Sequence, residues 1–593
     1  MDSVTPEIAF GVTASASGRR WIWRRGEERL SLGIAQQLGV PEIVGRLLTA
    51  RGVGIDDAAH FLSPTLRALM PDPSVMQDMD EAAERLARAV IAGEKVAVFG
   101  DYDVDGGCAG ALMASLLRGL GLDPITYVPD RIAEGYGPNP IAMRALADRG
   151  ASLVICVDCG TSAHEALSVI HNRADIIVLD HHKADGPTPQ ILATVNPNRL
   201  EDTSGLRALC ATGVAFLTAV ATVRALRRAG FFANRAEPNL LHMLDLVALA
   251  TVCDVMPLSG LNRALVAQGL KVIGSRARPG IAALLDVAQA RETPTAFTCG
   301  FALGPRINAG GRISEPDLGM RLLLTEDEDE ARALAATLDA VNRQRQQVEA
   351  GILDSAMLMA QGQSDEGNPV LLLAGPDWHP GVVGIVAGRV KEKFNRPTCV
   401  GALQDGLVKG SARSVPGLDL GTAIIAARQA GILLTGGGHA MAAGFSLRAD
   451  RLAEFHSFMN ERLAGASSLP SAADLAVEAT VTVPGATTEL AGEIGRLAPF
   501  GAGNEEPVIV LPRVRVIRAD RIGKDGNSLR AFIEGEGGGA RLKALCFRLG
   551  DGPLAQLLLA RERIPLHLAG YLRAETWNGQ TTASFFISDA AQV

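Results

Sequence analysis

The sequence predicts an α/β protein built on a parallel sheet, followed by a smaller α/β domain and a C-terminal β-barrel. Three observations lead to this fold class. Short apolar runs alternate with helical stretches between about residues 95 and 200, which is typical of a parallel, doubly wound sheet. A strand–helix–strand pattern returns from about residue 368. From about residue 480, short strands separated by turns follow one another, which fits a small barrel.

Length and composition limit the class of protein. The chain has 593 residues, enough for three to four domains of about 150 residues each. It has no uncharged apolar run of about 18 residues, as a membrane helix would need, and no basic start followed by an apolar stretch, as a secretory signal would need. The net charge of −8 argues weakly against nucleic-acid binding, although it does not report local basic patches. We expect a cytoplasmic monomer without a membrane segment.

The eight cysteines are scattered along the chain, which is typical of reduced thiols in a cytoplasmic protein. One pair, Cys156 and Cys159, has the C-x-x-C spacing. A structural zinc site needs further ligands at similar spacing, and the sequence offers none. We therefore expect these two cysteines to pack as small apolar side chains around Asp158.

The patterns divide the chain into six segments. The long helix in the middle is indicated by a capping box, Thr325 and Glu328, at its start. The expected segments are a loose tail (1–25), an N-terminal helical segment (26–92), the parallel-sheet domain (93–322), a connecting helix (323–365), a second α/β domain (366–466) and the barrel (480–593).

Three aspartates crowd the end of the first predicted strand of the sheet. The stretch "VAVFGDYDVDGG" places Asp101, Asp103 and Asp105 at alternating positions after a buried apolar run. In open α/β sheets, ligands bind beyond the carboxyl ends of the strands. Alternation along an extended turn would direct Asp103 and Asp105 to different places.

Further acidic and imidazole side chains follow other apolar runs, which are also expected to be strands. Asp158 follows "LVICV", Asp180 begins "DHH" after "IIVL", and Asp254 follows "LVALATVC". Taken alone, each aspartate also fits the N-cap of a following helix. Together with His181 and His182 at one sheet edge, these carboxylates need cations to neutralise them. Carboxylate-rich sites with one or two imidazoles suit Mn²⁺ or Mg²⁺ better than zinc.

Four of these stretches, "GDYDVDG", "VDCG", "LDHH" and "ATVCDVMPL", resemble in order the motifs of the DHH phosphoesterase superfamily. Further stretches resemble the RecJ family within it, over nearly the whole chain. These are "PDRIAEGYGPNP", "LGPRINAGGRIS", "WHPGVVGIVAGRVKEKFNRP", "GSARSVPGLDL", "GGGHAMAAGFS" and "LAPFGAGNEEPV". The resemblance implies a DHH catalytic domain, a DHH-associated domain that binds nucleic acid, and an OB-fold barrel.

The resemblance also implies two metal ions that share Asp158. Asp103 and Asp158 would bind one ion. The other ion would be bound by Asp105, Asp158, His181 and Asp254. His182 would touch the phosphate or orient its neighbour. Some members have a metal-binding histidine at the position of Phe99, so Asp101 or a water would take that place here.

The candidate substrate-binding residues lie in four further motifs. They are Arg131, Tyr136, Arg306, Asn308, Arg312, Arg413, Gly437, Gly438 and His439. Arg306 and Arg312 are either surface arginines or a clamp on a terminal 5′ phosphate, with Asn308 assisting. The glycines before His439 are expected to form a turn ahead of a helix, with exposed N–H groups for the phosphates of the strand.

The barrel carries basic and aromatic residues that together fit sequence-tolerant binding of single strands. The basic residues are Arg513, Arg515, Arg518, Arg521 and Lys524, and the aromatic residues are Phe532, Phe547, Tyr571, Trp577 and Phe585. Alternating arginines on one strand fit a solvated face equally well, and part of the aromatic set must belong to the core.

The resemblance implies a metal-dependent, single-stranded-DNA-specific 5′→3′ exonuclease that releases 5′ mononucleotides during recombination and repair. Its implied partners are a single-strand-binding protein and a RecQ-type helicase. One alternative is a small-substrate phosphoesterase acting on pyrophosphate, oligoribonucleotides or cyclic dinucleotides, against which the N-terminal helices and the barrel argue. The other is a non-catalytic replication scaffold, against which the complete set of predicted ligands argues.

Overall fold

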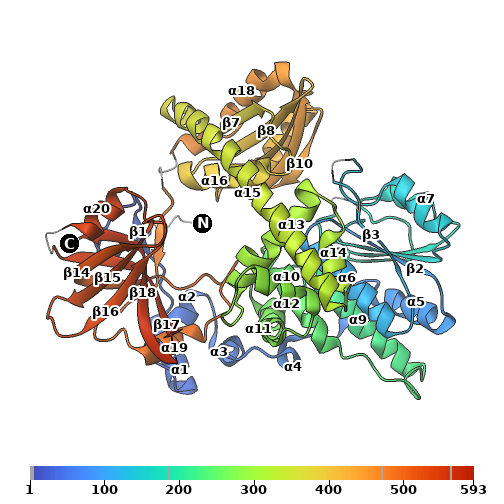
Figure 1. The fold of residues 1–593 in the computed structure, drawn as a ribbon, viewed down its shortest axis with the longest axis horizontal. Helices are drawn as coiled ribbons and strands as arrows, with labels where there is room; N and C mark the ends of the chain where they lie inside the picture. Colours follow the sequence, from blue (N-terminus) through green and yellow to red (C-terminus); the bar gives the residue numbers. More distant parts are fainter. Residues whose placement is uncertain (1–5, 132, 185, 469–471, 561–563, 578) are drawn as a thin grey trace. The chain divides into compact units, whose positions relative to one another are not determined.

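The computed structural model describes residues 6–593 except 132, 185, 469–471, 561–563 and 578, and the chain divides into two compact units (Figure 1). The first unit contains residues 1–58, 345–497 and 506–593, and the second contains residues 59–344 and 498–505. Each unit is therefore assembled from segments that are distant in the sequence. In the described part of the chain, no helix is long and apolar enough to cross a membrane.

The second unit is built on a five-stranded parallel sheet, as the alternating pattern predicts. The strand order is β3-β2-β4-β5-β6. The strands are β2 (Val96–Gly100), β3 (Ile125–Tyr127), β4 (Leu153–Val157), β5 (Asp175–Leu179) and β6 (Ala193–Val195). The central strands β2 and β4 are buried throughout, which explains why they read as continuous apolar runs rather than as alternating ones.

Helices cover both faces of this sheet (Figure 1). One face packs against α5 (Met79–Ala92), α6 (Val104–Gly119), α9 (Ala211–Arg228) and α10 (Leu244–Cys253). The other face packs against α7 (Pro140–Asp148) and α8 (His164–Ser168). Further helices extend the first layer: α4 (Leu66–Leu69), α11 (Gly260–Ser275), α12 (Pro279–Val287), the π-helix η4 (Thr298–Leu303), α13 (Gly304–Ile313) and α14 (Leu318–Leu324). The predicted doubly wound α/β class is confirmed.

A short loop from far along the chain completes the second unit. Residues 498–505 return to it, and the carbonyl oxygen of Ala502 accepts a hydrogen bond from the N–H of Leu258 (2.8 Å). Arg263 is fully buried and donates to the carbonyl oxygens of Ala498 (2.7 Å) and Phe61 (2.8 Å). The loop is thereby fixed to the segment that follows α10.

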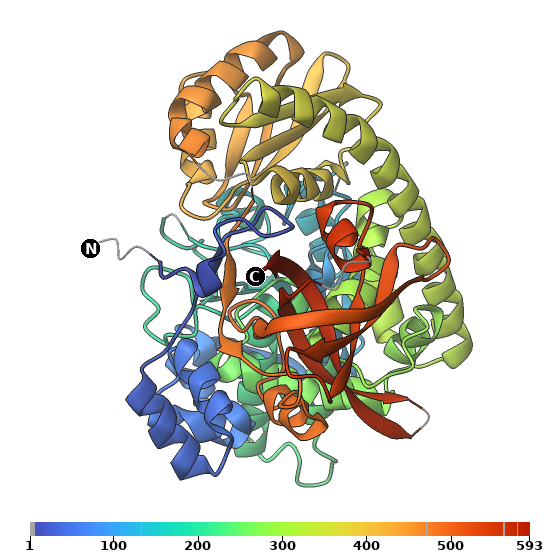
Figure 2. The same ribbon diagram turned by 90° about the vertical axis from the view of Figure 1, so that its left-hand side faces the viewer.

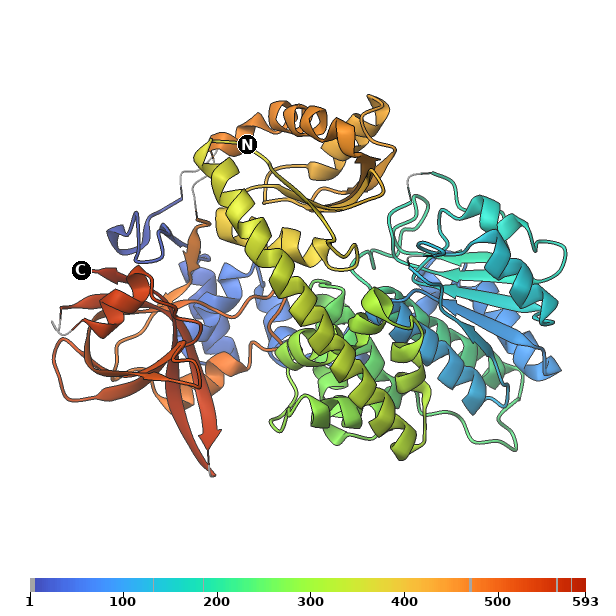
Figure 3. The same cartoon turned by 45° about the horizontal axis from the view of Figure 1, so that its top comes forward.

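In the first unit, the smaller α/β domain has a five-stranded sheet in the order β10-β11-β9-β8-β7. The strands are β7 (Leu371–Pro376), β8 (Thr398–Gln404), β9 (Leu407–Arg413), β10 (Thr435–His439) and β11 (Ala442–Arg448). On one face lie α17 (Leu420–Gln429) and α18 (Leu452–Arg462). On the other lie α16 (Val383–Phe394) and the second half of the long helix α15 (Glu328–Asp365) (Figure 3).

The three consecutive glycines lie in the edge strand β10, so the prediction of a turn ahead of a helix is wrong. The strand forms because β10 pairs residue by residue with β11. Close packing explains the glycine at position 438. A Cβ atom on Gly438, which has a φ of +150°, would lie 2.4 Å from the carbonyl oxygen of Ala442. The turn instead joins β10 to β11.

The C-terminal domain is the predicted barrel (drawn in red in Figure 2). Its sheet has the order β13-β14-β15-β16-β18-β17, and a further pairing of β14 with β17 closes it. The strands are β13 (Ala479–Thr480), β14 (Ile509–Ile522), β15 (Ser528–Gly535), β16 (Arg541–Cys546), β17 (Leu566–Trp577) and β18 (Gln580–Gln592). The helices α19 (Thr488–Gly495) and α20 (Pro553–Leu559) accompany them.

The N-terminal segment packs against the barrel, so the prediction of a loose tail is wrong for its described residues. Strand β1 (Trp21–Trp23) pairs in parallel with β12 (Leu475–Val477). The buried indole N–H of Trp21 donates to Asp589 of β18 (3.0 Å). The helices α1 (Glu28–Leu38), α2 (Glu42–Ala50) and α3 (Ile55–Leu62) follow. The tryptophan is buried because it extends the core of the barrel.

Candidate metal centre

The turn between β2 and α6 explains the three crowded aspartates. Asp103 caps α6, and its Oδ1 accepts hydrogen bonds from the N–H groups of Asp105 (2.9 Å) and Gly106 (3.0 Å). A Cβ atom on Gly106 would lie 2.6 Å from the backbone of Asp101, so the chain can double back this tightly only with glycine there. Asp105 lies inside the first helical turn rather than in an extended turn, and its carboxylate belongs to a different group of potential metal ligands from that of Asp103.

The carboxylate of Asp105 is held by the N-terminus of α9. It accepts hydrogen bonds from the N–H groups of Ala211 (2.7 Å) and Thr212 (2.8 Å) and from the Thr212 hydroxyl (2.6 Å). The partial positive charge of the helix N-terminus stabilises a negative charge at this position. Asp105 is therefore fixed in orientation although it is buried.

Asp158 follows β4 with a left-handed backbone, at a φ of +60°. This conformation is uncommon for a residue with a side chain and often marks a functional position. The side chain is buried, and its Oδ1 atom has no hydrogen-bond partner in the described part of the structure.

Asp180, the first residue of the "DHH" sequence, orients the two histidines that follow it. Its carboxylate accepts hydrogen bonds from the Thr161 N–H (3.1 Å) and hydroxyl (2.7 Å), from the His181 N–H (2.7 Å) and from Nδ1 of His182 (2.8 Å). Burial would lower the pKa of His182, but the hydrogen bond to Asp180 and its charge raise it to about 9. Asp180 is already surrounded by donors, so it supports the site rather than offering a free oxygen.

Asp254 lies at the end of helix α10, so the prediction that it follows a strand is wrong. An apolar run such as "LVALATVC" fits a buried helix as well as a buried strand. The helix nevertheless brings Asp254 to the same edge of the sheet. Its Oδ2 lies 3.4 Å from Nε2 of His181.

The side chains converge around His181 and Asp158. From Nε2 of His181, the nearest carboxylate oxygens of Asp158 and Asp105 lie at 3.4 and 3.7 Å. Three groups each bring their ligand atoms within 4.8 Å of one another. They are Asp101–Asp103–Asp158, Asp105–His181–Asp254 and Asp158–His181–His182. Asp158 belongs to two of the groups, and Asp103 and Asp105 belong to different ones.

The electrostatics of this cluster favour a bound cation. Burial, followed by the charges of neighbouring aspartates, raises the pKa of Asp101 and of Asp158 well above the ordinary value, and raises that of Asp254 to about 8. Asp101, Asp158 and Asp254 each have one buried carboxylate oxygen without a hydrogen-bond partner among the described residues. Oxygens of this kind, beside an imidazole, are the donor set that Mn²⁺ and Mg²⁺ prefer.

Phe99 cannot supply a ligand, because it is buried in β2 and stacks on Tyr127 with 5.4 Å between ring centroids. Asp101 instead lies with Asp103 and Asp158. Cys156 and Cys159 are buried, and all eight cysteines are free thiols. Among the described residues, neither cysteine of this pair belongs to a group that could hold a metal.

The raised pKa of Asp254 predicts how pH affects the metal-free protein. An exposed aspartate has a pKa of about 3.9, whereas the pKa of Asp254 in the folded state is raised to about 8. Between these values the folded state binds more protons, so the free energy of unfolding falls as the pH rises. We expect the melting temperature in EDTA to fall from pH 5 to pH 8, and the gain on adding Mn²⁺ to grow over that range. Asp254→Asn should flatten the EDTA profile; an unchanged slope would contradict this assignment.

The structure places the candidate substrate residues of the second unit around this cluster in different ways. The Tyr136 hydroxyl donates to the carbonyl oxygen of Asp158 (2.9 Å) and lies 3.1 Å from Nδ1 of His182. The Arg131 guanidinium lies over the Tyr102 ring, 5.1 Å from its centroid. Arg312 is close enough to affect the pKa of Tyr102, although burial and neighbouring charges contribute more.

Arg306 and Asn308 are already engaged within the second unit. Nε of Arg306 donates to Asp339 on α15 (2.9 Å), and the Asn308 side-chain oxygen accepts from the N–H of Val104 (3.2 Å). Asn308 thus tethers α13 to the start of α6. Both side chains therefore have partners within the protein.

The remaining candidates belong to the first unit. His439 on β10 and Arg413 on β9 are both register partners of Ala442, so the two residues lie in one row across three strands. Gly437 and Gly438 belong to the same edge strand.

The barrel's basic strand is largely matched by carboxylates. Arg513 pairs with Glu536 (2.6 Å), Arg518 with Asp520 (2.8 Å) and Arg521 with Asp551 (2.6 Å). Phe585 is buried in the core, Phe532 and Phe547 are exposed, and the side chain of Trp577 lies outside the described structure.

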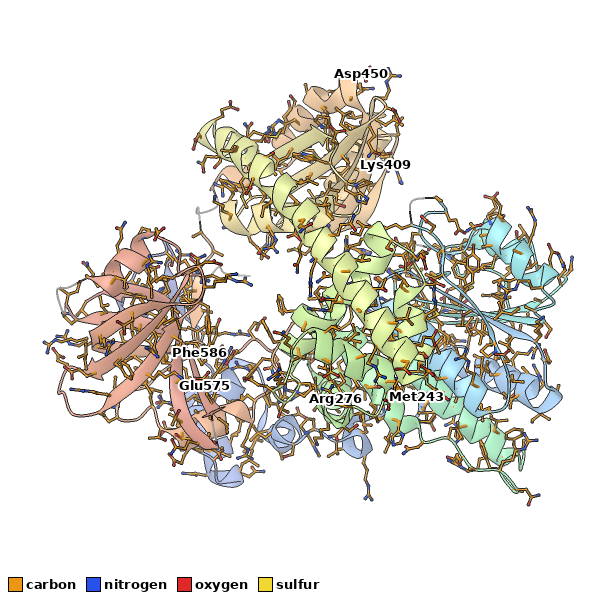
Figure 4. The ribbon with its side chains drawn as sticks, viewed as in Figure 1. Met243, Arg276, Lys409, Asp450, Glu575 and Phe586 are labelled. Atoms are coloured by element: carbon orange, nitrogen blue, oxygen red, sulfur yellow. The ribbon has the colours of Figure 1, made fainter. Side chains whose placement is uncertain are left out.

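A groove of about 610 Å³ lies on one face of the barrel. It is lined by Ile517, Arg518, Phe532, Arg541, Leu542, Lys543, Thr582 and Ala583. The β17–β18 hairpin that contributes to it carries Phe586 and Glu575 (labelled in Figure 4), and Glu575 pairs with Lys543 (3.0 Å).

Two supporting residues of the cluster were not found by sequence reasoning. Thr212 holds Asp105 from 107 positions away, and its only sequence signal is a threonine at a predicted helix start. Gly311 is the other. A Cβ atom there would lie 2.6 Å from the carbonyl oxygen of Tyr102, so α13 lies directly against the loop that carries Asp101 and Asp103.

This close approach predicts the effect of a methyl group. Gly311→Ala should lower the free energy of unfolding by about 1–3 kcal/mol, as overpacking generally does, and should lower activity by displacing the Asp101–Asp103 loop. Gly362→Ala on α15 is the matched control, because nothing lies within 4 Å of its Cβ position. That change should stabilise by about 0.5–1 kcal/mol through helix propensity. Chemical denaturation and metal binding would be measured for both variants. Equal effects of the two alanine substitutions would contradict the packing argument.

Comparisons with known proteins agree with this architecture. Residues 95–251 match the DHH family N-terminal domain, residues 367–465 the DHHA1 domain and residues 477–589 the RecJ OB domain. The parallel sheet with its cluster of carboxylates and imidazoles, together with these domains, defines a DHH-type protein with an OB-fold barrel.

Relatives with known names are similar over most of their length. The single-stranded-DNA-specific exonucleases RecJ of Dickeya dadantii and Escherichia coli are 37% and 36% identical, over 86% of this chain and 90% and 89% of theirs. The one from Bacillus subtilis is 33% identical over 97% of this chain and 71% of its own. The chain belongs to the RecJ family.

Solved structures support the same conclusion. RecJ from Thermus thermophilus in complex with Mn²⁺ matches with a TM-score of 0.78 at 30% identity, covering 96% of this chain and 78% of that one. The Mg²⁺ complex from the same organism matches with a TM-score of 0.73 at 28% identity, covering 96% of this chain and 77% of that one.

Proposed function

We propose that this protein is a metal-dependent exonuclease specific for single-stranded DNA, which degrades it from the 5′ end and releases 5′ mononucleotides. The observation that carries the proposal is the cluster around Asp158 and His181, in a chain 37% identical to a RecJ exonuclease. Its unpartnered buried oxygens are suited to cations that act on phosphodiesters.

Two cations, Mn²⁺ or Mg²⁺, would be held by two sets of side chains in the cluster. Asp101, Asp103 and Asp158 would hold one, and Asp105, His181 and Asp254 the other. Asp158 would be shared between them, because its Oδ1 also lies 3.4 Å from Nε2 of His181. When bound, such a pair activates a water and stabilises the leaving oxygen of an in-line displacement at phosphorus. The α9 N-terminus keeps Asp105 oriented, and Asp180 fixes the ring of His182, whose raised pKa makes it a cationic contact for a phosphate.

The substrate would be held through its backbone, which carries no sequence information. Arg131 and Arg312 lie on the Tyr102 side of the cluster and are suited to a terminal 5′ phosphate, as arginine binds phosphate through paired donors. In the first unit, Arg413 and His439 share a row with the edge strand that carries Gly437 and Gly438. We assign this row to backbone phosphates of single-stranded DNA.

We further propose that the protein acts as a monomer in the cytoplasm, in recombination and repair. A single-strand-binding protein and a RecQ-type helicase would supply its substrate, because a strand-specific exonuclease needs unwound DNA. The free thiols are in keeping with a reducing compartment.

The test uses three DNA substrates: a 5′-labelled single strand, its blunt duplex and a 3′-blocked single strand. With Mn²⁺ or Mg²⁺, labelled mononucleotide should be released from both single strands and not from the duplex. Intact DNA combined with hydrolysis of pyrophosphate or of a dinucleotide would favour a small-substrate phosphoesterase. Binding of single strands without any cleavage would favour a scaffold.

A further inference from the structure

Two phenylalanines form an exposed stacked pair in the second unit. Phe297 and Phe301 are 68% and 69% exposed, the largest exposed fractions among phenylalanines in the described part of the chain. Their ring centroids lie 4.6 Å apart with the ring planes 21° from parallel. Leaving two large apolar rings in water forgoes about 1.5–3 kcal/mol each relative to burial.

The pair is held on a π-helix, a rare element that is frequent at functional sites. Phe297 precedes η4, and Phe301 lies within it. Leu303 of the same element is buried in the core, so the element is anchored on one side and presents the rings on another. The backbone is therefore fixed while both rings remain exposed.

This element packs against the end of α10, next to the metal centre. The Cys253 thiol donates to the carbonyl oxygen of Cys299 (3.5 Å), and a Cβ atom on Gly300 would lie 3.5 Å from Val252. Cys253 immediately precedes Asp254, which the proposed function assigns to a metal. One layer of packing therefore connects the aromatic pair to the candidate active site.

We propose that Phe297 and Phe301 form a stacking platform for a nucleobase of the single-stranded DNA substrate, an inference that rests on the proposed function. The cations and arginines engage phosphates, which leaves the bases in need of an apolar surface. Stacking suits an enzyme that does not read sequence, because every base presents a flat face.

A protein partner is less well matched to this surface. Two aromatic side chains supply roughly 300–500 Å² of contact area at 150–250 Å² each. A standard protein–protein interface needs about 800 Å² on each side. The platform instead has the dimensions of one or two bases, and it lies beside the centre through which the strand must pass.

The binding experiment uses 5′-phosphorylated oligothymidylate in EDTA and in an Asp158→Asn background, so that no cleavage accompanies binding. Replacing both phenylalanines by alanine should weaken binding about tenfold, which is within the range for loss of one stacked base. Phe297→Tyr with Phe301→Trp keeps the rings and should restore binding to within about twofold of the parent. Ile141→Ala on α7 is the matched control, since that side chain is 79% exposed and lies on the opposite side of the sheet from α10.

An abasic residue moved stepwise along the oligonucleotide identifies the contact. At one position, loss of the base should weaken binding to the parent about tenfold and leave binding to the double alanine variant unchanged. Equal binding by parent and double variant would overturn the platform, as would identical abasic profiles. The platform would then serve a protein contact or the fold.

The proposed function is tested separately on the wild-type chain. If wild-type protein degrades single-stranded DNA while the double alanine variant binds as the parent does, only the platform is wrong. If wild-type protein neither binds nor degrades single-stranded DNA, the proposed function fails, and the platform fails with it.

Discussion

Asp158→Asn should reduce the rate of single-strand degradation by about 10³-fold. Loss of this charge at the metal centre should raise the activation free energy by about 4 kcal/mol, and each 1.4 kcal/mol corresponds to about a tenfold change in rate. Asp158 is the carboxylate common to two of the three groups, with Oδ1 3.4 Å from Nε2 of His181. Asp158 is a proposed ligand in one cation site and lies against His181 in the other, so its replacement should weaken both, whereas a change at Asp103 or Asp254 should weaken one.

The same variant should be more stable than wild type when metal is removed. Burial raises the pKa of Asp158, and the charges of Asp105 and Asp103 raise it further, so a carboxylate here opposes folding at neutral pH. A neutral amide removes that repulsion. The melting temperature in EDTA at pH 8 should thus rise, although the activity measured with metal falls.

A matched control separates the site from the general loss of a carboxylate. Asp148 lies in the same unit, on the surface, paired with Arg173 at 2.8 Å. Asp148→Asn should leave both activity and melting temperature near the wild-type values, since exposed ion pairs contribute little. Residual activity of Asp158→Asn above a tenth of wild type would show that Asp158 does not bridge the centre.

Asp180→Asn should reduce activity by up to about 100-fold, the usual range when a group that orients a metal ligand is lost. The carboxylate accepts hydrogen bonds from Thr161, His181 and His182. An amide turns an N–H₂ group toward some of these donors, so the free energy of unfolding should fall by about 1–3 kcal/mol.

Metal titration distinguishes this variant from the loss of a ligand. Asp180 acts through the histidines, so raising the Mn²⁺ concentration should restore much of the activity of Asp180→Asn. The same titration should not restore Asp158→Asn. If neither variant responds to metal, or both do, the distinction between supporting and ligating carboxylates would be wrong.

Local sequence was sufficient to predict the sheet and most of the cluster. Strands β2, β4 and β5 are short apolar runs, and each ends at an acidic residue. Because parallel strands share one carboxyl edge, the strand pattern alone was enough to expect Asp103, Asp158 and His181 together.

The predictions that were wrong depend on contacts that local sequence does not contain. Asp254 ends a helix, because a fully buried helix has no amphipathic period to distinguish it from a strand. Trp21 packs at the barrel because its strand pairs with Leu475, 454 positions away. The glycines before His439 form a strand because β11 pairs with them, which overrides their turn propensity.

The return of residues 498–505 to the second unit has a consequence for how the protein is made. Arg263 emerges from the ribosome early, yet its acceptor on Ala498 is encoded 235 residues later. At about 5–20 residues per second, the chain waits on the order of 10–50 seconds for that acceptor. Until then the catalytic unit lacks its final segment, so a transcript cut short before residue 498 would yield an incomplete nuclease. Because this segment comes late in the sequence, the DNA-degrading unit is completed only after residue 505 has been translated.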